Sequence, residues 1–304
     1  MAFAVSARLR RDETVDTFAA ILEIEGEKLD VWVKRPRPEL RTNTELERAL
    51  IEWGESQVEL DHEHVVAVLE SGQGPKGAYV IQERVDGVPL AAVMAVLRRK
   101  KRTLSPTHAL TVAARICDAA AYLATALPPG HGGLAPGHIY LGYQGEVRVA
   151  DPQLGRLHAP VGVDLLDTKS QPYLSPEVRD GQTSTPQADV YSLALIIIEM
   201  VIGHPVWTGK RMSPEDALSA MSDFTQLGQA NGQLAQELGN LLKPCVSSNA
   251  SVRPANAARV YEGLQSLLTK HNVFGDDLAL GTFVESILPP GDGEEAPTMM
   301  DSTK

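Results

Sequence analysis

Residues 131–156 read HGGLAPGHIYLGYQGEVRVADPQLGR, and the interpretation of the chain turns on this stretch. Two short apolar runs, IYLG and EVRV, are separated by a Gly-containing turn and predict a pair of short strands. The loop before the pair carries His131 and His138, and the loop after it carries Asp151. The stretch therefore predicts a small strand pair flanked by two loops with polar side chains.

The chain before this stretch is predicted to be rich in strands. Residues 3–35 alternate apolar and polar side chains, which indicates a small antiparallel sheet. Residues 44–60 have apolar side chains at helical spacing, and Thr44 and Glu47 are placed to form a capping box at the start of that helix. Two further strands are predicted over 65–70 and 78–84.

After Gly87 the pattern becomes mostly helical. Helices are predicted over 90–97, 106–126, 188–202, 213–221, 234–242 and 255–271. A strand-rich part followed by a helical part indicates an α+β fold and not a doubly wound sheet. Residues 276–288 predict a short amphipathic helix, and 289–304, rich in Pro, Gly and acidic residues, a disordered tail.

Composition limits the classes of function. The 304 residues are enough for one bilobal domain or two domains, and the formal net charge of -11 argues against nucleic acid as a partner. Cys117 and Cys245 have no metal-binding or disulfide spacing, as in a reduced intracellular protein. The apolar run 193–202 is shorter than a membrane span, and the N-terminus does not resemble a signal peptide. We therefore expect a cytoplasmic protein without membrane binding.

An ordered set of motifs resembles the bacterial eukaryotic-type (Hanks-type) Ser/Thr protein kinase domain. The motifs, each beside the pattern it resembles, are VWVK at 31–34 (V-A-I-K), HEHVV at 62–66 (H-P-N-I-V), YVIQERVDG at 79–87 (gatekeeper and hinge), 131–138 (H-R-D-L-x-x-x-N), DPQ at 151–153 (D-F-G), SPE at 175–177 (A-P-E), DVYSL at 189–193 and VRP at 252–254. The resemblance covers residues 3–271.

This resemblance implies a kinase-like domain over 1–274, with a small strand-rich lobe with one helix over 1–86 and a large helical lobe over 87–274. Residues 275–304 would form the C-terminal helix and acidic tail. It also implies structural roles: Glu177 pairs with Arg253, Asp189 holds the backbone of the catalytic loop, and His131 braces that loop.

The residues that would perform chemistry are replaced. By resemblance, Gly133 replaces the Asp that accepts the substrate's proton, Ala135 replaces the loop Lys, and His138 replaces the magnesium-binding Asn. Imidazole is a poor magnesium ligand. Residues 11–17, in the slot of the glycine-rich loop, contain no glycine and three acidic residues. The catalytic positions are therefore degenerate, and no metal site is expected.

Four residues could still bind a nucleotide, if one is bound: Lys34, the hinge residues Glu83 and Val85, and Asp151. The simpler interpretation of Lys34 is a solvated strand residue, and that of Asp151 is a cap or bridge for backbone groups. Pro152 is expected to push Asp151 into extended backbone. For the partner of Lys34 on the first helix we prefer Glu52, although Trp53 falls near the expected slot.

The sequence favours a pseudokinase that acts as a signalling scaffold or regulator through protein binding, with no cofactor expected. The alternative is a weakly active or unconventional Ser/Thr kinase, and ATP and magnesium are expected only in that case. Thr298 stands three residues before Asp301, as in the pThr-x-x-Asp pattern that forkhead-associated domains bind. Thr298 is thus a candidate phosphosite, and an active kinase or a forkhead-associated-domain protein is a candidate partner.

Overall fold

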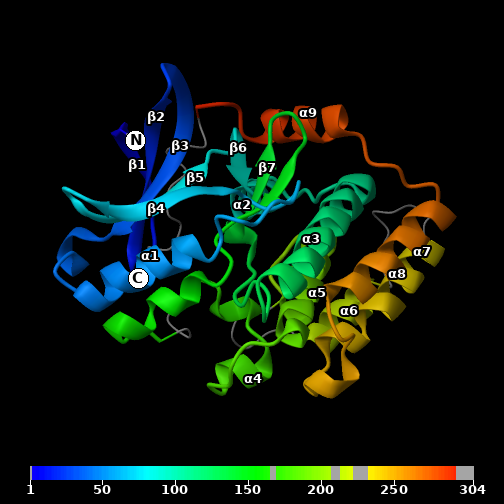
Figure 1. Cartoon of the computed structure of the whole chain (residues 1–304). Helices are drawn as coiled ribbons and strands as arrows, with labels where there is room; N and C mark the ends of the chain where they lie inside the picture. The colour runs from blue at the N-terminus through cyan, green and yellow to red at the C-terminus, as the bar shows by residue number, and fades with distance from the viewer. Residues whose placement is uncertain (1, 165–168, 207–212, 222–231, 292–304) are drawn as a thin grey trace.

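The computed structural model describes residues 2–164, 169–206, 213–221 and 232–291. Figure 1 shows a strand-rich lobe formed by the first part of the chain and a helical lobe formed by the rest. The α+β architecture with a small strand-rich lobe and a large helical lobe, predicted from the sequence, is confirmed.

The small lobe is a five-stranded antiparallel sheet in the order β1-β2-β3-β5-β4. Its strands are β1 (Ala2–Arg11), β2 (Val15–Ile24), β3 (Glu27–Pro36), β4 (Val68–Gly74) and β5 (Gly77–Glu83). The β2–β3 register pairs Thr17 with Lys34, so two polar side chains lie side by side at the end of the hairpin away from its turn.

One helix, α1 (Thr44–Glu55), packs on this sheet through Leu46, Leu50 and Trp53. The predicted capping box is wrong. The N-cap is Asn43, whose side chain accepts a hydrogen bond from the Leu46 amide at 2.9 Å. Glu47 instead accepts from the Ala78 amide on β5 at 3.1 Å, so its carboxylate joins the helix to the sheet and does not close the helix end.

The helices of the large lobe are α2 (Leu90–Arg99), α3 (Pro106–Ala126), α4 (Pro176–Arg179), α5 (Pro186–Ile202), α6 (Pro214–Met221), α7 (Gly232–Leu242), α8 (Ala257–Lys270) and α9 (Asp277–Ile287). The lobe is built around helices α3 and α5, which carry more buried side chains than its other described helices. As predicted, the apolar run 193–202 is a core helix segment. Its buried Glu199 is satisfied by Arg98 at 3.0 Å and by the Tyr173 hydroxyl at 2.7 Å.

Helix α3 is long and apolar enough to cross a membrane by length and composition, which the sequence analysis did not anticipate. In the fold it packs against α5 and α8, and 61% of its apolar window is buried. An apolar helix that is covered by other helices in this way has the packing of a core helix.

A second sheet, β6-β7-β8, lies in the large lobe next to the cleft. Strand β6 (Gly87–Pro89) pairs with β7 (Ile139–Gly142), which pairs with β8 (Val147–Val149). The strand pair predicted within 131–156 is therefore present. Helix α9, predicted over 276–288, packs on β7 and α2 (Figure 1).

An ion pair joins helix α4, which carries Glu177, to Arg253 in the segment before helix α8. Arg253 makes two parallel hydrogen bonds to the Glu177 carboxylate, at 2.6 and 2.8 Å. The guanidinium also donates to the carbonyl oxygens of Ser247 (2.8 Å) and Gln187 (3.1 Å) and lies over the Tyr191 ring. Its side chain is fully buried, so its charge depends on these partners.

Arg253→Ala is expected to lower the free energy of unfolding by about 3–5 kcal/mol, because it leaves the Glu177 carboxylate without its cation. Urea denaturation measures this loss. The matched control is Arg259→Ala, which breaks an ion pair with Glu262 whose side chains are 69% and 61% exposed. That control should change stability by less than about 0.5 kcal/mol. Equal effects of the two substitutions would contradict a structural role for Arg253.

Candidate functional site

Lys34 and Asp151 meet across the cleft between the two lobes. Lys34 lies on β3, Asp151 lies two residues after β8, and Nζ is 3.0 Å from Oδ2. Lys34 also donates to Thr17 Oγ1 at 3.0 Å, and Gln82 donates to Asp151 Oδ1 at 3.4 Å. Lys34 and Asp151 are 3% and 2% exposed, so Lys34 is not a solvated strand residue. The structure thus brings together two of the four candidate nucleotide ligands.

Arg10 on β1 reaches into the same cleft, and sequence analysis did not identify it. Its guanidinium is 2.8 Å from Asp12 Oδ2 and 3.7 Å from Asp151 Oδ2, and it donates to the Gly137 carbonyl at 3.1 Å. Burial opposes ionisation of Asp151, but the adjacent Lys34 and Arg10 cations outweigh burial and lower the pKa of this carboxyl. Arg10 therefore ties the small lobe to the catalytic-loop segment and contributes to the charge balance of the cleft.

The backbone at Asp151 differs from the expected extended conformation. Its φ is 62°, in the left-handed region, and the φ of Gln153 is 59°. Proline at 152 disfavours the right-handed helical region for the preceding residue, and Asp is among the residues that adopt positive φ most readily. The prediction was wrong about the backbone, and the carboxylate of Asp151 points at Lys34.

The preference for Glu52 as the partner of Lys34 is also wrong. Glu52 is 64% exposed and lies 3.7 Å from Arg48 on the same helix. Trp53 takes the inward position, because it continues the apolar stripe of Leu46 and Leu50, and its indole Nε1 donates to the Pro152 carbonyl at 2.8 Å. Helix α1 therefore contacts the segment after Asp151 through the Trp53 indole. The carboxylate that pairs with Lys34 comes from Asp151 and not from this helix.

The loop before β7 is held by Asp189, the residue that the resemblance assigned to this role. Asp189 accepts hydrogen bonds from the amides of His131 (2.6 Å) and Gly132 (2.9 Å). Burial raises the pKa of Asp189 to about 7 despite these two donors. Gly130 has a φ of 124°, and a Cβ there would lie 2.4 Å from Asp189 Oδ2, so only glycine fits beside this carboxylate.

His131 and His138 are buried and their rings stack 5.5 Å apart. A ring nitrogen of His131 lies 3.0 Å from the Ala150 carbonyl, and one of His138 lies 3.0 Å from the Gly133 carbonyl. Burial lowers the pKa of His131 to about 3 and that of His138 to about 4, so both rings are neutral. His131 is thus placed to brace the loop, as the resemblance implied.

The other two degenerate positions lie beside this pair. Ala135 is buried, and no cationic side chain extends from that position. A Cβ added at Gly133 would meet no described heavy atom within 4 Å, so crowding by the described residues does not account for the missing carboxylate.

The hinge end of the cleft is filled by side chains. Trp32, Val66, Val85 and Ala150 form one buried cluster, and the rings of Trp32 and Tyr140 lie 4.7 Å apart. The side chain of Glu83 is used elsewhere, since it accepts from the Ala67 amide at 3.1 Å and lies 3.6 Å from Arg148. Sequence analysis missed Trp32, although a tryptophan in the alanine slot of the V-A-I-K motif was a visible signal.

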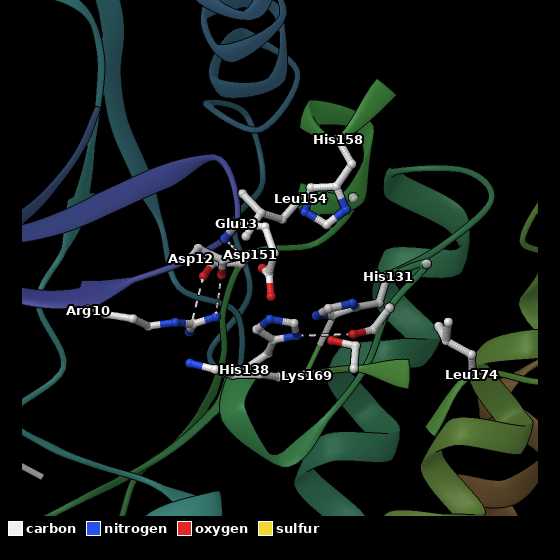
Figure 2. Close-up of a pocket in the computed structure, with 14 residues that line it drawn as sticks. Arg10, Asp12, Glu13, His131, His138, Asp151, Leu154, His158, Lys169 and Leu174 are labelled. Carbon is white, nitrogen blue, oxygen red and sulfur yellow. Dashed lines mark hydrogen bonds and ion pairs between the residues drawn. The ribbon is translucent and has the colours of Figure 1, made fainter. Parts of the chain in front are cut away.

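A pocket remains between the β1–β2 turn and the loops of the large lobe (Figure 2). Asp12 and Glu13 line it from the turn, and His131, His138 and His158 line it from the large lobe. Burial and the neighbouring Asp12 raise the pKa of Glu13 to about 7. Burial lowers the pKa of His158. The candidate phosphosite Thr298 lies outside the described residues.

Comparison with known proteins agrees with this geometry. Residues 12–262 match the family described as "Protein tyrosine and serine/threonine kinase". Serine/threonine-protein kinase PknB of Mycolicibacterium smegmatis is 26% identical over 251 residues, which cover 77% of this chain and 39% of that protein. Serine/threonine-protein kinase PknB of Mycobacterium tuberculosis is 29% identical over 190 residues, covering 59% and 29%. The chain thus spans well under half the length of these curated relatives.

A solved structure shows the same fold. The kinase domain of PknI from Mycobacterium tuberculosis superposes with a TM-score of 0.64 at 18% sequence identity, covering 88% of this chain and 96% of that one. At this identity the likeness concerns the fold.

The buried histidines predict a pH dependence of stability. Their folded-state pKa values lie below the ordinary 6.5, so the stability they contribute is present above about pH 6.5 and is lost as the pH falls toward 4. Each accounts for at most about 1.4 kcal/mol per pH unit in this window. His138→Asn should reduce the slope of unfolding free energy against pH by up to that amount, measured by urea denaturation at pH 5, 6 and 7.

The matched control is His204→Asn, because His204 is exposed. Comparing slopes removes the contributions of the other titrating groups, including Asp189, whose raised pKa acts in the opposite direction. If His138→Asn leaves the slope unchanged, His138 is not held neutral by burial.

Proposed function

We propose that this chain, which belongs to the protein tyrosine and serine/threonine kinase family, is a pseudokinase. It would act in signalling as a scaffold or regulator through protein binding. The observation that carries this proposal is the glycine at 133, where phosphoryl transfer requires a carboxylate to accept the substrate's proton. Of the described carboxylates lining the pocket, Asp151 is bound by Lys34, and Asp12 and Glu13 come from the opposite lobe. None of these three extends from the catalytic loop.

The residues present do not fit ATP with magnesium. In this family the nucleotide lies between the hinge and the strand lysine. Here the buried cluster that contains Trp32, Tyr140 and Val85 lies at the hinge end, and Arg10 lies with Asp12 at the phosphate end. His138, at the position of a magnesium ligand, is a buried neutral imidazole, whereas magnesium prefers oxygen ligands. We therefore propose that the protein acts without a cofactor. Separately, we propose that it acts in the cytoplasm.

The alternative function is that of a weakly active or unconventional ATP-binding Ser/Thr kinase. The Lys34–Asp151 ion pair favours it, because both charged groups that contact nucleotide and metal in active kinases are kept and lie in contact. The curated relatives are named serine/threonine-protein kinases, which agrees with either function. Nucleotide binding by the native chain distinguishes the two.

Thermal unfolding with ATP and magnesium or manganese tests the proposal. The native chain is expected to show no stabilisation at millimolar nucleotide, whereas a ligand at 100 times its dissociation constant adds about 2.7 kcal/mol. Trp32→Ala, which restores the alanine of the V-A-I-K motif and removes the ring from the hinge end, is expected to allow nucleotide-dependent stabilisation to appear.

The matched control is Val31→Ala, a buried residue on the same strand that packs with Leu22 and Ile81 and not in the Trp32 cluster. It should lower stability without creating a nucleotide response. A large shift in the native chain, followed by transfer of phosphate to a protein substrate, would establish the alternative function instead.

For the partner, we propose a forkhead-associated-domain protein that binds phosphorylated Thr298. A peptide of residues 292–304 phosphorylated at Thr298 should bind such a domain at least tenfold more tightly than its unphosphorylated form, because the phosphate adds about −1.5 to −2 charge and three acceptors. Fluorescence anisotropy measures the affinity.

The matched control is the same peptide phosphorylated at Thr303, because residues 292–304 as a peptide contain no aspartate after that threonine. Equal binding of the two phosphopeptides would refute recognition of the pThr-x-x-Asp pattern. In that case an active kinase, captured by the full chain but lost on truncation after Leu288, would be the remaining candidate.

A further inference from the structure

His158 is a buried histidine that lines the pocket and has no hydrogen-bond partner at either ring nitrogen among the described residues. It lies between two short 3-10 turns, Leu154–Leu157 and Ala159–Val161, and is 6% exposed. Leaving a buried polar group unsatisfied costs about 1–3 kcal/mol. A neutral imidazole in this setting has a free lone pair for a ligand in the pocket.

Two carboxylates lie opposite this ring. Asp12 and Glu13 are at the β1–β2 turn, and one ligand atom from each of Asp12, Glu13 and His158 lies within 4.8 Å of the other two. Figure 2 shows Glu13 extending from the turn into the pocket and His158 at its opposite wall. The three residues come from segments about 145 positions apart in the sequence, so the tertiary fold alone brings them together.

We propose that Asp12, Glu13 and His158 form a binding site for a divalent transition-metal cation of the zinc class. Zinc binds both imidazole nitrogen and carboxylate oxygen, and three protein ligands with a water in the fourth position are a known zinc arrangement. Metal–ligand bonds of about 2.0–2.2 Å place ligand atoms about 3.3 Å apart, so binding must draw the three side chains together. Glu13 is half-buried at a turn and can make that movement.

The ligand atoms of the site, more than the charges around it, select the class of cation. Arg10 already pairs with Asp12, and Lys169 also lines the pocket, so a bound cation must compete with two positive groups. Asp151 lines the same pocket and adds negative charge. Magnesium takes oxygen ligands and loses its water reluctantly, so the imidazole selects against it. A cation with real affinity for imidazole nitrogen is therefore expected to bind and magnesium is not.

The proposal goes beyond a pseudokinase function and does not depend on it. A cation at this position would link the β1–β2 turn of the small lobe to the segment that follows Asp151. It would therefore hold the two lobes together at a further point, besides the Lys34–Asp151 pair and the contacts of Arg10 and Trp53. Metal binding is expected to protect the amides of residues 158–164 from hydrogen exchange.

Titration of the metal-free full chain with Zn²⁺, followed by calorimetry, tests the site, and Co²⁺ serves as a spectroscopic probe of imidazole ligation. The native chain should bind one Zn²⁺ at this site, unaffected by millimolar Mg²⁺. Glu13→Gln and His158→Ala should each weaken this binding by at least tenfold, since even the loss of a residue that only supports a metal ligand costs about 10–100-fold. Glu13→Gln changes a half-buried side chain and should keep the fold intact.

The matched control is His62→Ala, which removes another histidine that lies near a carboxylate, 3.7 Å from Asp118. It should leave the affinity and the Co²⁺ spectrum unchanged. The proposal is overturned if Glu13→Gln binds Zn²⁺ as tightly as the native chain, if His62→Ala loses the binding instead, or if Mg²⁺ displaces Zn²⁺ at comparable concentration.

Discussion

The buried ion pair between Lys34 and Asp151 is the interaction on which the arrangement of the two lobes depends. Neither charge reaches solvent, and each comes from a different lobe. A buried charge without its partner costs about 3–5 kcal/mol, so separation of the lobes at this point is strongly disfavoured. The neighbouring groups are arranged around this pair: Thr17 accepts a hydrogen bond from Lys34, and Gln82 donates one to Asp151. Arg10 and Trp53 approach the same segment.

Further contacts join the two sides of the cleft. Arg10 joins β1 to the catalytic-loop segment at Gly137, and Trp53 joins α1 to the Pro152 carbonyl. At the hinge end, Trp32 packs against Tyr140. The cleft keeps the buried lysine–aspartate pair while Trp32 and Tyr140 occupy its hinge end, and both observations bear on the proposed function.

Most elements of the fold could be predicted from the sequence, because hydrophobic periodicity and turn residues report local structure directly. Helix α3 begins and ends at the predicted residues, and the Glu177–Arg253 contact follows from motifs that the resemblance recognised. The errors have a common cause. Thr44, Glu47 and Glu52 were assigned from neighbours in sequence, whereas Glu47 bonds to a strand about thirty residues away and Glu52 is turned outward by the apolar stripe that buries Trp53.

By itself, the sequence determined the α+β lobes, the order of the kinase motifs and the absence of an acid at position 133. These are properties of residue identity and local spacing. Only the tertiary structure decided what Asp151 binds, what fills the hinge end and which groups meet His158, because each depends on segments more than a hundred residues apart. The identities of Gly132, Gly133 and His138 show which side chains the loop lacks, whereas the positions of Trp32 and Arg10 in the cleft became visible only in the tertiary structure.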